Sequence, residues 1–162
     1  EKLMSSIINN FESSILLVPF TLSDLEQIKP FLFSDFDEFW NYDTLKEELK
    51  SELSKYIVLK NPDNSIIGFC GIKIIFDTAE IMNIVVKKSF RGKHLSTYMM
   101  NYIIDFCKSH NVSNINLEVN IKNTIAISLY KKYNFKEVGL RKNYYNGTDD
   151  AVLMTLELDK IF

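Results

Sequence analysis

The sequence predicts a mixed α/β fold, in which helices cover both faces of a twisted central sheet. An apolar run, Ile81–Val86, is typical of a buried strand, and a basic turn and an amphipathic helix follow it directly. Further strand and helix patterns alternate after it, which favours parallel strands, while short polar turns elsewhere indicate antiparallel hairpins. We therefore expect about seven strands and about four helices, in the order β-α-α-β-β-β-α-β-α-β-β.

The N-terminal part is expected to contain a strand and a helix. Residues 1–14 are polar and rich in Ser and Asn, so we expect a loose lead-in. Ile15–Phe20 is the first predicted strand, and Pro19 breaks it. Ser23 is the expected cap of a helix that Pro30 kinks or ends.

Next comes an unusually aromatic connection, Ser34–Tyr42. It either folds over the edge of the core or contacts a ligand, and the pattern does not separate these two interpretations. Asp43 or Thr44 is the expected cap of a second helix. Its apolar face is predicted to carry Leu45, Leu49 and Leu53.

The next two strands are predicted to form a hairpin. Tyr56–Lys60 and Ser65–Ile75 are apolar, and the turn Asn61–Asn64 joins them. Gly68 and Gly71 interrupt the second strand, which indicates a bulge or a close packing contact.

The chain is organised around Glu80–Leu95, which reads as a strand, a turn with Arg91, Gly92 and Lys93, and the start of a helix. That helix has apolar residues at a 3.6-residue period: Leu95, Tyr98, Met99, Tyr102, Ile103, Phe106 and Cys107. A helix N-terminus offers unpaired N–H groups and a partial positive charge, so this segment can hold a phosphate. The alternative is an ordinary solvated strand–helix connection.

The C-terminal part is expected to contain three strands and one helix. Ile115–Val119, Phe135–Leu140 and Ala151–Leu158 are the predicted strands, and Asn123 is the expected helix cap. The apolar side of this helix is predicted to carry Ile125, Ala126, Leu129, Tyr130 and Tyr133.

Composition indicates one globular domain. The chain has 162 residues, 46% of them hydrophobic and 25% charged, with a net charge of -2. This charge gives no sign of nucleic-acid binding, and no apolar run is long enough for a membrane span. Cys70 and Cys107 lie in apolar segments, which favours core thiols and a reducing, cytoplasmic location without a signal peptide. His94 and His110 are too few and too far apart to predict a metal site.

One strand face carries candidate catalytic chemistry. In Ile115–Asn120, alternation separates three apolar side chains from Asn116, Glu118 and Asn120. Tyr130 follows on the next helix, and both residues could meet at the carboxyl end of the sheet. The alternatives are a solvated strand face for Glu118 and a core tyrosine for Tyr130.

The central segment resembles motif A of the GNAT N-acetyltransferases. The resemblance rests on Glu80–Val86 followed by Arg91–Ser96, and on Asn123–Tyr130 leading to Asn134–Phe135. Further segments are similar to the RimI-type ribosomal-protein alanine N-acetyltransferases: Trp40–Leu45, Leu117–Val119, Arg141–Tyr145 and Asp150–Ala151. The likeness covers the chain from about Ile15 to Leu158 and implies a GNAT-like acyl-CoA N-acyltransferase fold over a single domain, 1–162.

The resemblance implies transfer of acetyl from acetyl-CoA to a protein N-terminus, with Glu118 as general base and Tyr130 as general acid. A ribosomal protein is the implied acceptor, and a monomer or weak dimer without metal is expected. The implied cofactor-binding residues are Ile84, Val85, Val86, Arg91, Gly92, Lys93, His94, Leu95, Ser96, Thr97 and Asn123. The implied acceptor-binding residues are Trp40, Glu80, Asn83, Tyr144 and Tyr145.

Two positions depart from the family pattern, which has small residues where this chain has His94 and Ser96. A histidine either narrows the phosphate cradle or points outward, so cofactor binding is expected to survive in weakened form. Two other functions fit the same resemblance: acetylation of a small amine or a lysine side chain, and a catalytically silent acyl-CoA-binding module. The paired tyrosines favour a peptide acceptor, and the presence of both Glu118 and Tyr130 argues against a silent module.

Overall fold

The computed structural model describes residues 7–8, 15–36 and 41–159. The chain forms two compact units: unit 1 comprises residues 1–73 and 82–103, and unit 2 comprises residues 74–81 and 104–162. The expected single domain over 1–162 stays a prediction. Of the expected lead-in, only residues 7–8 are described, and they form a short strand.

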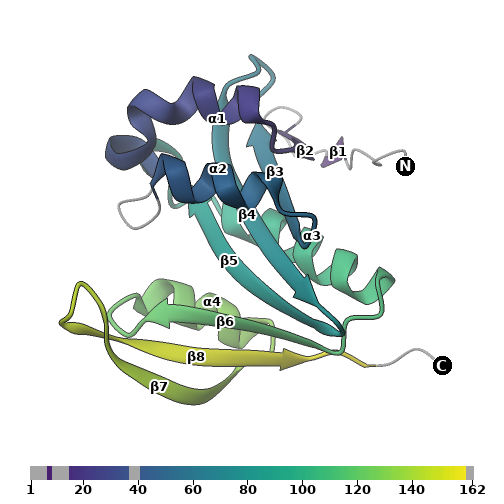
Figure 1. Cartoon of the computed structure of the whole chain (residues 1–162), viewed down its shortest axis with the longest axis vertical. Coiled ribbons are helices and arrows are strands. Elements are labelled where there is room, and N and C mark those ends of the chain that lie inside the picture. Colours follow the sequence, from purple (N-terminus) through teal and green to yellow (C-terminus); the bar gives the residue numbers. More distant parts are fainter. Residues whose placement is uncertain (1–6, 9–14, 37–40, 160–162) are drawn as a thin grey trace. The chain divides into compact units, whose positions relative to one another are not determined.

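Unit 1 is built on antiparallel strands in the order β1-β2-β3-β4, followed by β5 (Figure 1). Their bounds are β1 Ile7–Ile8, β2 Ile15–Pro19, β3 Ser54–Lys60, β4 Ile66–Ile75 and β5 Thr78–Val86. The residues of β5 from Met82 onward belong to this unit. The predicted hairpin of β3 and β4 is confirmed.

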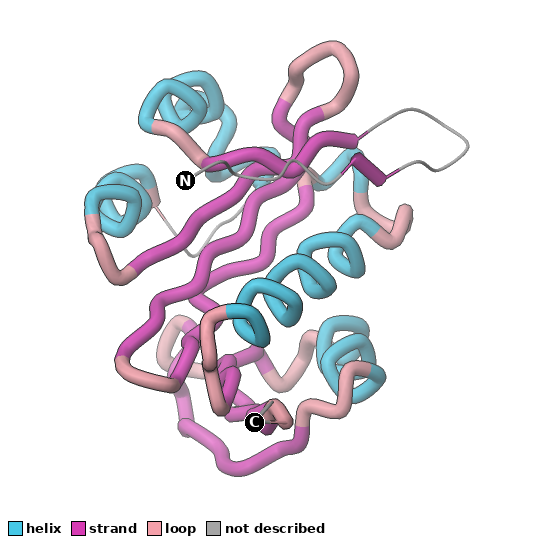
Figure 2. The backbone as a smooth tube through the Cα atoms, turned by 90° about the vertical axis from the view of Figure 1, so that its right-hand side faces the viewer, coloured by secondary structure: helices cyan, strands magenta, loops and turns pink. Residues whose placement is uncertain are grey.

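Helices lie on both faces of these strands. α1 (Leu22–Ile28) and α2 (Tyr42–Lys50) lie on one face, and the start of α3 (Leu95–Ser109) lies on the other, as Figures 1 and 2 show. A 3-10 turn at Lys29–Phe31 and a π-turn at Leu32–Phe36 follow α1. The core under α1 and α2 includes the fully buried side chains of Leu25, Leu45, Val58 and Phe69.

Both predicted caps in unit 1 were wrong. Thr21, not Ser23, caps α1, because its hydroxyl accepts from the Asp24 amide at 3.1 Å while Asp24 accepts from the Thr21 amide at 3.0 Å. Asn41, not Asp43 or Thr44, caps α2. The predicted apolar face of α2 holds at Leu45 and Leu49, but Leu53 lies beyond the helix end and is 53% exposed.

Unit 2 contains the start of β5 and a sheet in the order β5-β6-β8-β7. β6 runs parallel to β5 and antiparallel to β8, which pairs in turn with β7. The further elements are β6 Asn114–Asn120, α4 Thr124–Lys132, β7 Lys136–Tyr145 and β8 Asp149–Glu157. In the described part of the chain, the seven longer strands and the four α-helices follow the predicted order, so the mixed α/β class is confirmed.

Details in unit 2 differ from expectation. Ile125 is 85% exposed, so it does not belong to the buried side of α4. Phe135 is buried ahead of β7, and β7 extends beyond the predicted end at Leu140, up to Tyr145. The expected cap Asn123 is confirmed, because its Oδ1 accepts from the Ala126 amide at 3.1 Å.

Both cysteines are buried core residues, as expected. Burial raises the pKa of Cys70, and it raises the pKa of Cys107 to about 11. Neither thiol is therefore a ready nucleophile near neutral pH. None of the helices among the described residues has the length and apolar character needed to cross a membrane.

Candidate active site

The basic turn before α3 has an open backbone. Gly92 has a φ of 80° and His94 a φ of 59°, both in the left-handed region. Within the described residues, no atom lies within 4 Å of the place that a Cβ of Gly92 would take. A ligand can therefore approach this backbone closely, and the N-terminus of α3 follows at Leu95. These features fit the expected phosphate cradle.

Arg91 holds the turn in place. Its Nε donates to the Val86 carbonyl at 3.2 Å, and its Nη2 donates to the Phe36 carbonyl at 3.1 Å. The Lys93 ammonium lies 5.1 Å from the centre of the Phe90 ring. The charge of Arg91 is thus fixed at the end of β5 by bonds that use two of its five N–H donors.

In unit 1, β5 carries a buried polar pair beside the strand positions expected to bind cofactor. The Tyr56 hydroxyl faces the Asn83 amide, and both residues are buried. Neither side chain makes a hydrogen bond of normal geometry to any described residue. Burial is the main cause that raises the pKa of Tyr56. Buried polar groups without partners, such as these two beside Ile84–Val86, are rare in proteins and cost free energy of folding.

The polar face of β6 places Glu118 between two amides. Ile115, Leu117 and Val119 are buried, while the alternate residues are partly exposed, as the sequence predicts. Glu118 forms an ion pair with Arg141 of β7, with 2.9 Å between Oε1 and Nη2. The base predicted from sequence therefore has a partner that the sequence did not assign.

Strand register explains how Arg141 reaches Glu118. Ala151 of β8 pairs with Asn120 on one side and with Arg141 on the other. Ala151 carries only a methyl group, so the long Arg141 side chain can cross β8 toward Glu118. Residues opposite each other in register share a face, so Arg141 lies on the same face as Asn120. Glu118 is two residues from Asn120 on β6 and therefore lies on this polar face as well.

Tyr130 lies on α4 with its ring 5.9 Å from that of Phe135. Burial raises the pKa of Tyr130 to about 12. The hydroxyl is therefore protonated at any ordinary pH, which is the state that a general acid needs.

The hairpin of β7 and β8 carries the paired tyrosines. The rings of Tyr144 and Tyr145 meet edge to face, with centroids 5.0 Å apart, and the Arg141 guanidinium lies 4.8 Å from the Tyr144 centroid. The Asn143 amide donates to Asp150 Oδ1 at 3.0 Å. Arg141 thus links the predicted base to the predicted acceptor-binding aromatics.

A second polar contact joins β5 to β6 in unit 2. Asn116 donates from Nδ2 to Glu80 Oε1 at 3.3 Å, and its Oδ1 accepts from the Thr155 hydroxyl at 2.7 Å. Glu80 is thereby held on the polar face that also carries Glu118.

The family model for the acetyltransferase (GNAT) family matches residues 21–135. The chain belongs to the GNAT acetyltransferase family. It is therefore an acetyltransferase by descent, and members of this family use acetyl-CoA as cosubstrate.

Relatives of this GNAT chain cover most of its length. It is 33% identical to a protein of Bacillus subtilis (strain 168) whose name gives it provisionally as a ribosomal protein bS18-alanine N-acetyltransferase, over 86% of this chain and 93% of that one. It is also 31% identical to an N-alpha-acetyltransferase of Sulfolobus acidocaldarius, over 85% of this chain and 89% of that one.

Solved structures show the same GNAT fold. The ribosomal-protein-S18-alanine N-acetyltransferase from Escherichia coli matches with a TM-score of 0.82 and 24% identity, over 91% of this chain and 96% of that one. The spermidine/spermine N-acetyltransferase SpeG from Vibrio cholerae matches with a TM-score of 0.73 and 21% identity, over 88% of this chain and 92% of that one. At these identities the likeness shows the fold alone.

Within this GNAT chain, the structure joins some predicted site residues directly. Arg141 contacts both Glu118 and Tyr144, and Tyr144 contacts Tyr145. Trp40 lies outside the described residues. Sequence reasoning missed Arg141 as a site residue because alternation along β6 reveals a face but not which strand borders it. The only signal was its place next to the paired tyrosines.

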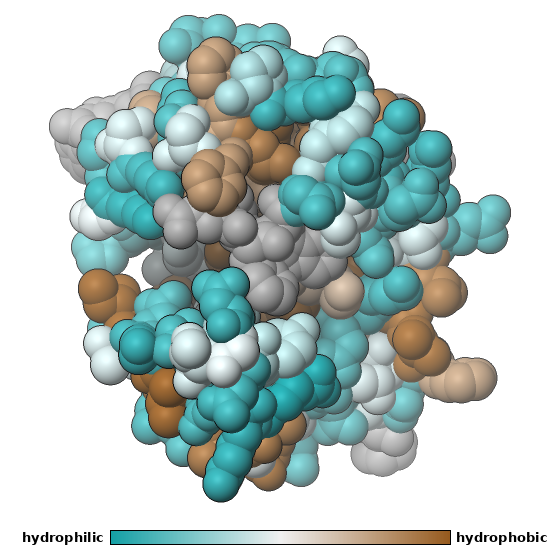
Figure 3. Space-filling model, turned by 60° about the vertical axis from the view of Figure 1, so that its left-hand side comes forward, coloured by the Kyte–Doolittle hydropathy of each residue, from teal (hydrophilic) through white to brown (hydrophobic). Residues whose placement is uncertain are grey.

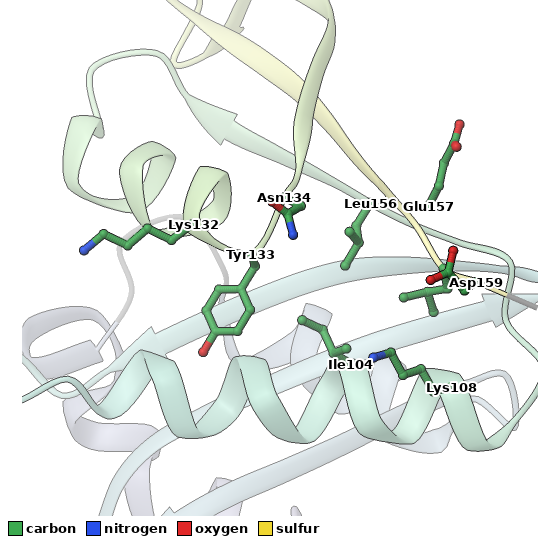
Figure 4. A pocket seen from close by; sticks show the side chains of 9 residues that line it. Ile104, Lys108, Lys132, Tyr133, Asn134, Leu156, Glu157 and Asp159 are labelled. Atoms are coloured by element: carbon green, nitrogen blue, oxygen red, sulfur yellow. The ribbon is translucent and has the colours of Figure 1, made fainter.

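Unit 2 has a cavity whose lining includes none of the predicted site residues. It has a volume of about 320 Å³, and Figure 4 shows α3, α4 and the end of β8 around it. Its lining consists of Ile104, Lys108, Lys132, Tyr133, Asn134, Leu156, Glu157, Leu158 and Asp159. On the molecular face in Figure 3, apolar side chains occur in small groups among polar ones. Neither feature adds a residue to the candidate site.

Proposed function

We propose that this chain acetylates the N-terminal α-amine of a protein, with a ribosomal protein as acceptor. The names of the relatives at 31–33% identity support this substrate class. The observation that carries the proposal is the contact of Glu118 with Arg141, which in turn contacts Tyr144, the neighbour of Tyr145. A carboxylate beside an aromatic hairpin suits a cationic amine at the end of an extended peptide. A cytoplasmic location and a monomeric or weakly dimeric state belong to the same proposal.

Acetyl-CoA is the proposed cosubstrate, and it supplies an activated acetyl thioester. The open backbone at Gly92 and the N-terminus of α3 would hold its phosphates, with Arg91 and Lys93 adding positive charge. Backbone groups of Ile84–Val86 would pair with its pantetheine arm. The remaining residues proposed to line the cofactor site are His94, Leu95, Ser96, Thr97 and Asn123.

Glu118 is the proposed general base. A protein α-amine has a pKa of about 7.7–8.0, so most of it is protonated at neutral pH and must lose a proton before attack. A carboxylate directly beside the amine, or one water away, removes that proton and typically contributes ~10²–10⁴ in rate.

Tyr130 is the proposed general acid. Its pKa of about 12 keeps the phenol protonated, and the departing thiolate needs such a donor. A backbone N–H near Val85 would stabilise the negative charge that develops on the acetyl oxygen. The two buried thiols need take no part.

The acceptor's first residues are proposed to lie against Tyr144 and Tyr145, with Glu80, Asn83 and Trp40 as further contacts. Glu80 is held by Asn116, which fixes the direction of its carboxylate. The buried amide of Asn83 has no hydrogen-bond partner of normal geometry among the described residues.

The test is to incubate the protein with acetyl-CoA and a library of peptides with free N-termini, and to read the products by mass spectrometry. Spermidine and peptides with blocked N-termini but free lysines serve as competing acceptors. We expect α-amine acetylation to dominate. Acetylation confined to lysine ε-amines or to spermidine would replace this proposal by the corresponding alternative.

A further inference from the structure

The carboxylate that is proposed to receive the acceptor's ammonium already holds a cation. Arg141 Nη2 lies 2.9 Å from Glu118 Oε1, which is hydrogen-bonding distance. An acceptor nitrogen that transfers its proton directly to Glu118 needs a similar distance to the same carboxylate. The guanidinium and the substrate ammonium are therefore like charges directed at the same carboxylate, and their repulsion makes them compete for it.

The ion pair between Arg141 and Glu118 can open at little cost in free energy. The Arg141 side chain is 53% exposed and that of Glu118 is 28% exposed. Ion pairs this close to solvent contribute little to stability, so their opening costs little. When Arg141 leaves Glu118, its guanidinium can remain against the Tyr144 ring, whose centroid is 4.8 Å away.

Arginine suits this place because it cannot take part in the proton transfer itself. Its guanidinium stays charged at any working pH, so it pairs with Glu118 without giving up a proton. The substrate ammonium, with a pKa of about 7.7–8.0, can give up a proton to Glu118 once it has replaced the guanidinium.

Resting on the proposed function, we propose that Arg141 is a positioning residue that exchanges places with the acceptor's α-ammonium at Glu118. The acceptor arrives as a cation and compensates Glu118 for the loss of Arg141. The acetylated product is a neutral amide and cannot replace Arg141 as the cation paired with Glu118. Arg141 therefore returns to Glu118 and disfavours the bound product.

The proposed transfer conserves protons and bonds. One proton passes from the ammonium to Glu118, the nitrogen–carbon bond forms, and the carbon–sulfur bond breaks. A second proton leaves the nitrogen as the amide forms and replaces the one that Tyr130 gives to sulfur. The proton on Glu118 passes to solvent when Arg141 restores the ion pair.

The test compares wild type with Arg141→Gln, using a peptide acceptor and its Nα-acetylated form as product inhibitor. Without the competing cation, the KM for the acceptor and the inhibition constant of the acetylated peptide should both fall by roughly two- to five-fold, the value of an exposed ion pair. The KM for acetyl-CoA should not change. Arg141→Lys should restore both constants toward wild type, and Lys142→Gln, which removes a neighbouring charge, should leave both unchanged.

The outcomes separate the two proposals. A wild-type protein that acetylates no peptide α-amine overturns both. A wild-type protein that acetylates α-amines, with an Arg141→Gln variant whose melting temperature is normal but whose acceptor KM is unchanged or raised, overturns the exchange alone. A fall in kcat without a fall in KM also overturns it, because Arg141 would then only orient Glu118.

Discussion

The ring of Tyr56 occupies the space that a side chain at Gly71 would need. The two residues pair across β3 and β4, and a Cβ added at Gly71 would overlap the ring. The sequence-based expectation of a close packing contact at this glycine is thereby confirmed. The absence of a side chain lets Tyr56 lie over β4 and direct its hydroxyl toward Asn83 on the next strand.

Gly71→Ala should therefore destabilise the protein by about 1–3 kcal/mol, the usual cost of overpacking a core. Urea unfolding measures this change. Gly139→Ala is a matched control on another strand, where the atom nearest to an added Cβ is the flexible end of Leu153, at 3.3 Å. Equal stability of the Gly71 variant and wild type would show that the ring moves aside without cost.

His94→Gly should raise the melting temperature by about 1–2 °C, because a residue with a Cβ is strained at a φ of 59°. It should also tighten acetyl-CoA binding, seen as a larger thermal shift with the cofactor. Ser96→Gly is the informative contrast, since it lies inside α3 and glycine destabilises a helix. If millimolar acetyl-CoA leaves the melting temperature of every variant unchanged, the cofactor proposal fails.

Asp24 should make stability depend on pH in the acid range. Burial alone raises the pKa of this carboxyl, but bonds from the Thr21 amide and hydroxyl and from Lys60, 3.0 Å away, bring it below the ordinary 3.8. A lowered pKa stabilises the fold above pH 4, and that contribution disappears as the pH falls through the folded-state value. Wild type should thus lose stability below about pH 4.

Asp24→Asn should be less stable than wild type at pH 7, by about 1–3 kcal/mol, but should lose less on acidification. Urea unfolding between pH 3 and pH 7 measures both effects. Asp105→Asn, at an exposed position of α3, is the control. Parallel pH curves for wild type and Asp24→Asn would contradict the assignment.

Glu118→Gln should lower kcat most near neutral pH, by ~10²–10⁴, with partial recovery at higher pH. The recovery is expected because the acceptor amine deprotonates by itself above its pKa of about 8. Rates of peptide acetylation from pH 6 to pH 10 measure this. Glu137→Gln on the edge strand is the control, and a full rate at pH 7 would remove Glu118 from the mechanism.

Tyr130→Phe should lower kcat while leaving the KM for both substrates near wild type. Since burial raises the pKa of Tyr130 to about 12, the wild-type rate should show no loss from its ionisation up to pH 10. Tyr133→Phe, at the C-cap of the same helix, is the control. A variant at position 130 with wild-type kcat across this range is incompatible with a general acid there.

The order of elements was predictable because each strand or helix carries its own hydrophobic period. The helix caps were not, because Thr21 and Ser23, or Asn41 and Asp43, are equally good caps in sequence, and the packing of each helix decides between them. Ile125 was placed wrongly because one residue of a helix can match the period and still face solvent.

For the candidate site, the alternation along β6 predicted the face of Glu118 correctly. The ion pair with Arg141 was not predictable, since it depends on the order β6-β8-β7, in which β8 comes between strands that are closer in sequence. The orphaned pair of Tyr56 and Asn83 was hidden for the same reason, because it joins strands across Gly71. Local patterns reveal faces, and only the register reveals which side chains meet.

The position of β7 as the last strand in the sheet has an evolutionary consequence. Val138 and Leu140 are exposed, Lys136 begins the strand and Lys142 lies within it, and the register with β8 shifts at two places. A sheet edge with these features resists pairing with a strand of another chain. Insertions and deletions between Arg141 and Asp149 would disturb only this edge of the sheet. Descendants of this chain could therefore change which peptide they accept while the rest of the fold stays intact.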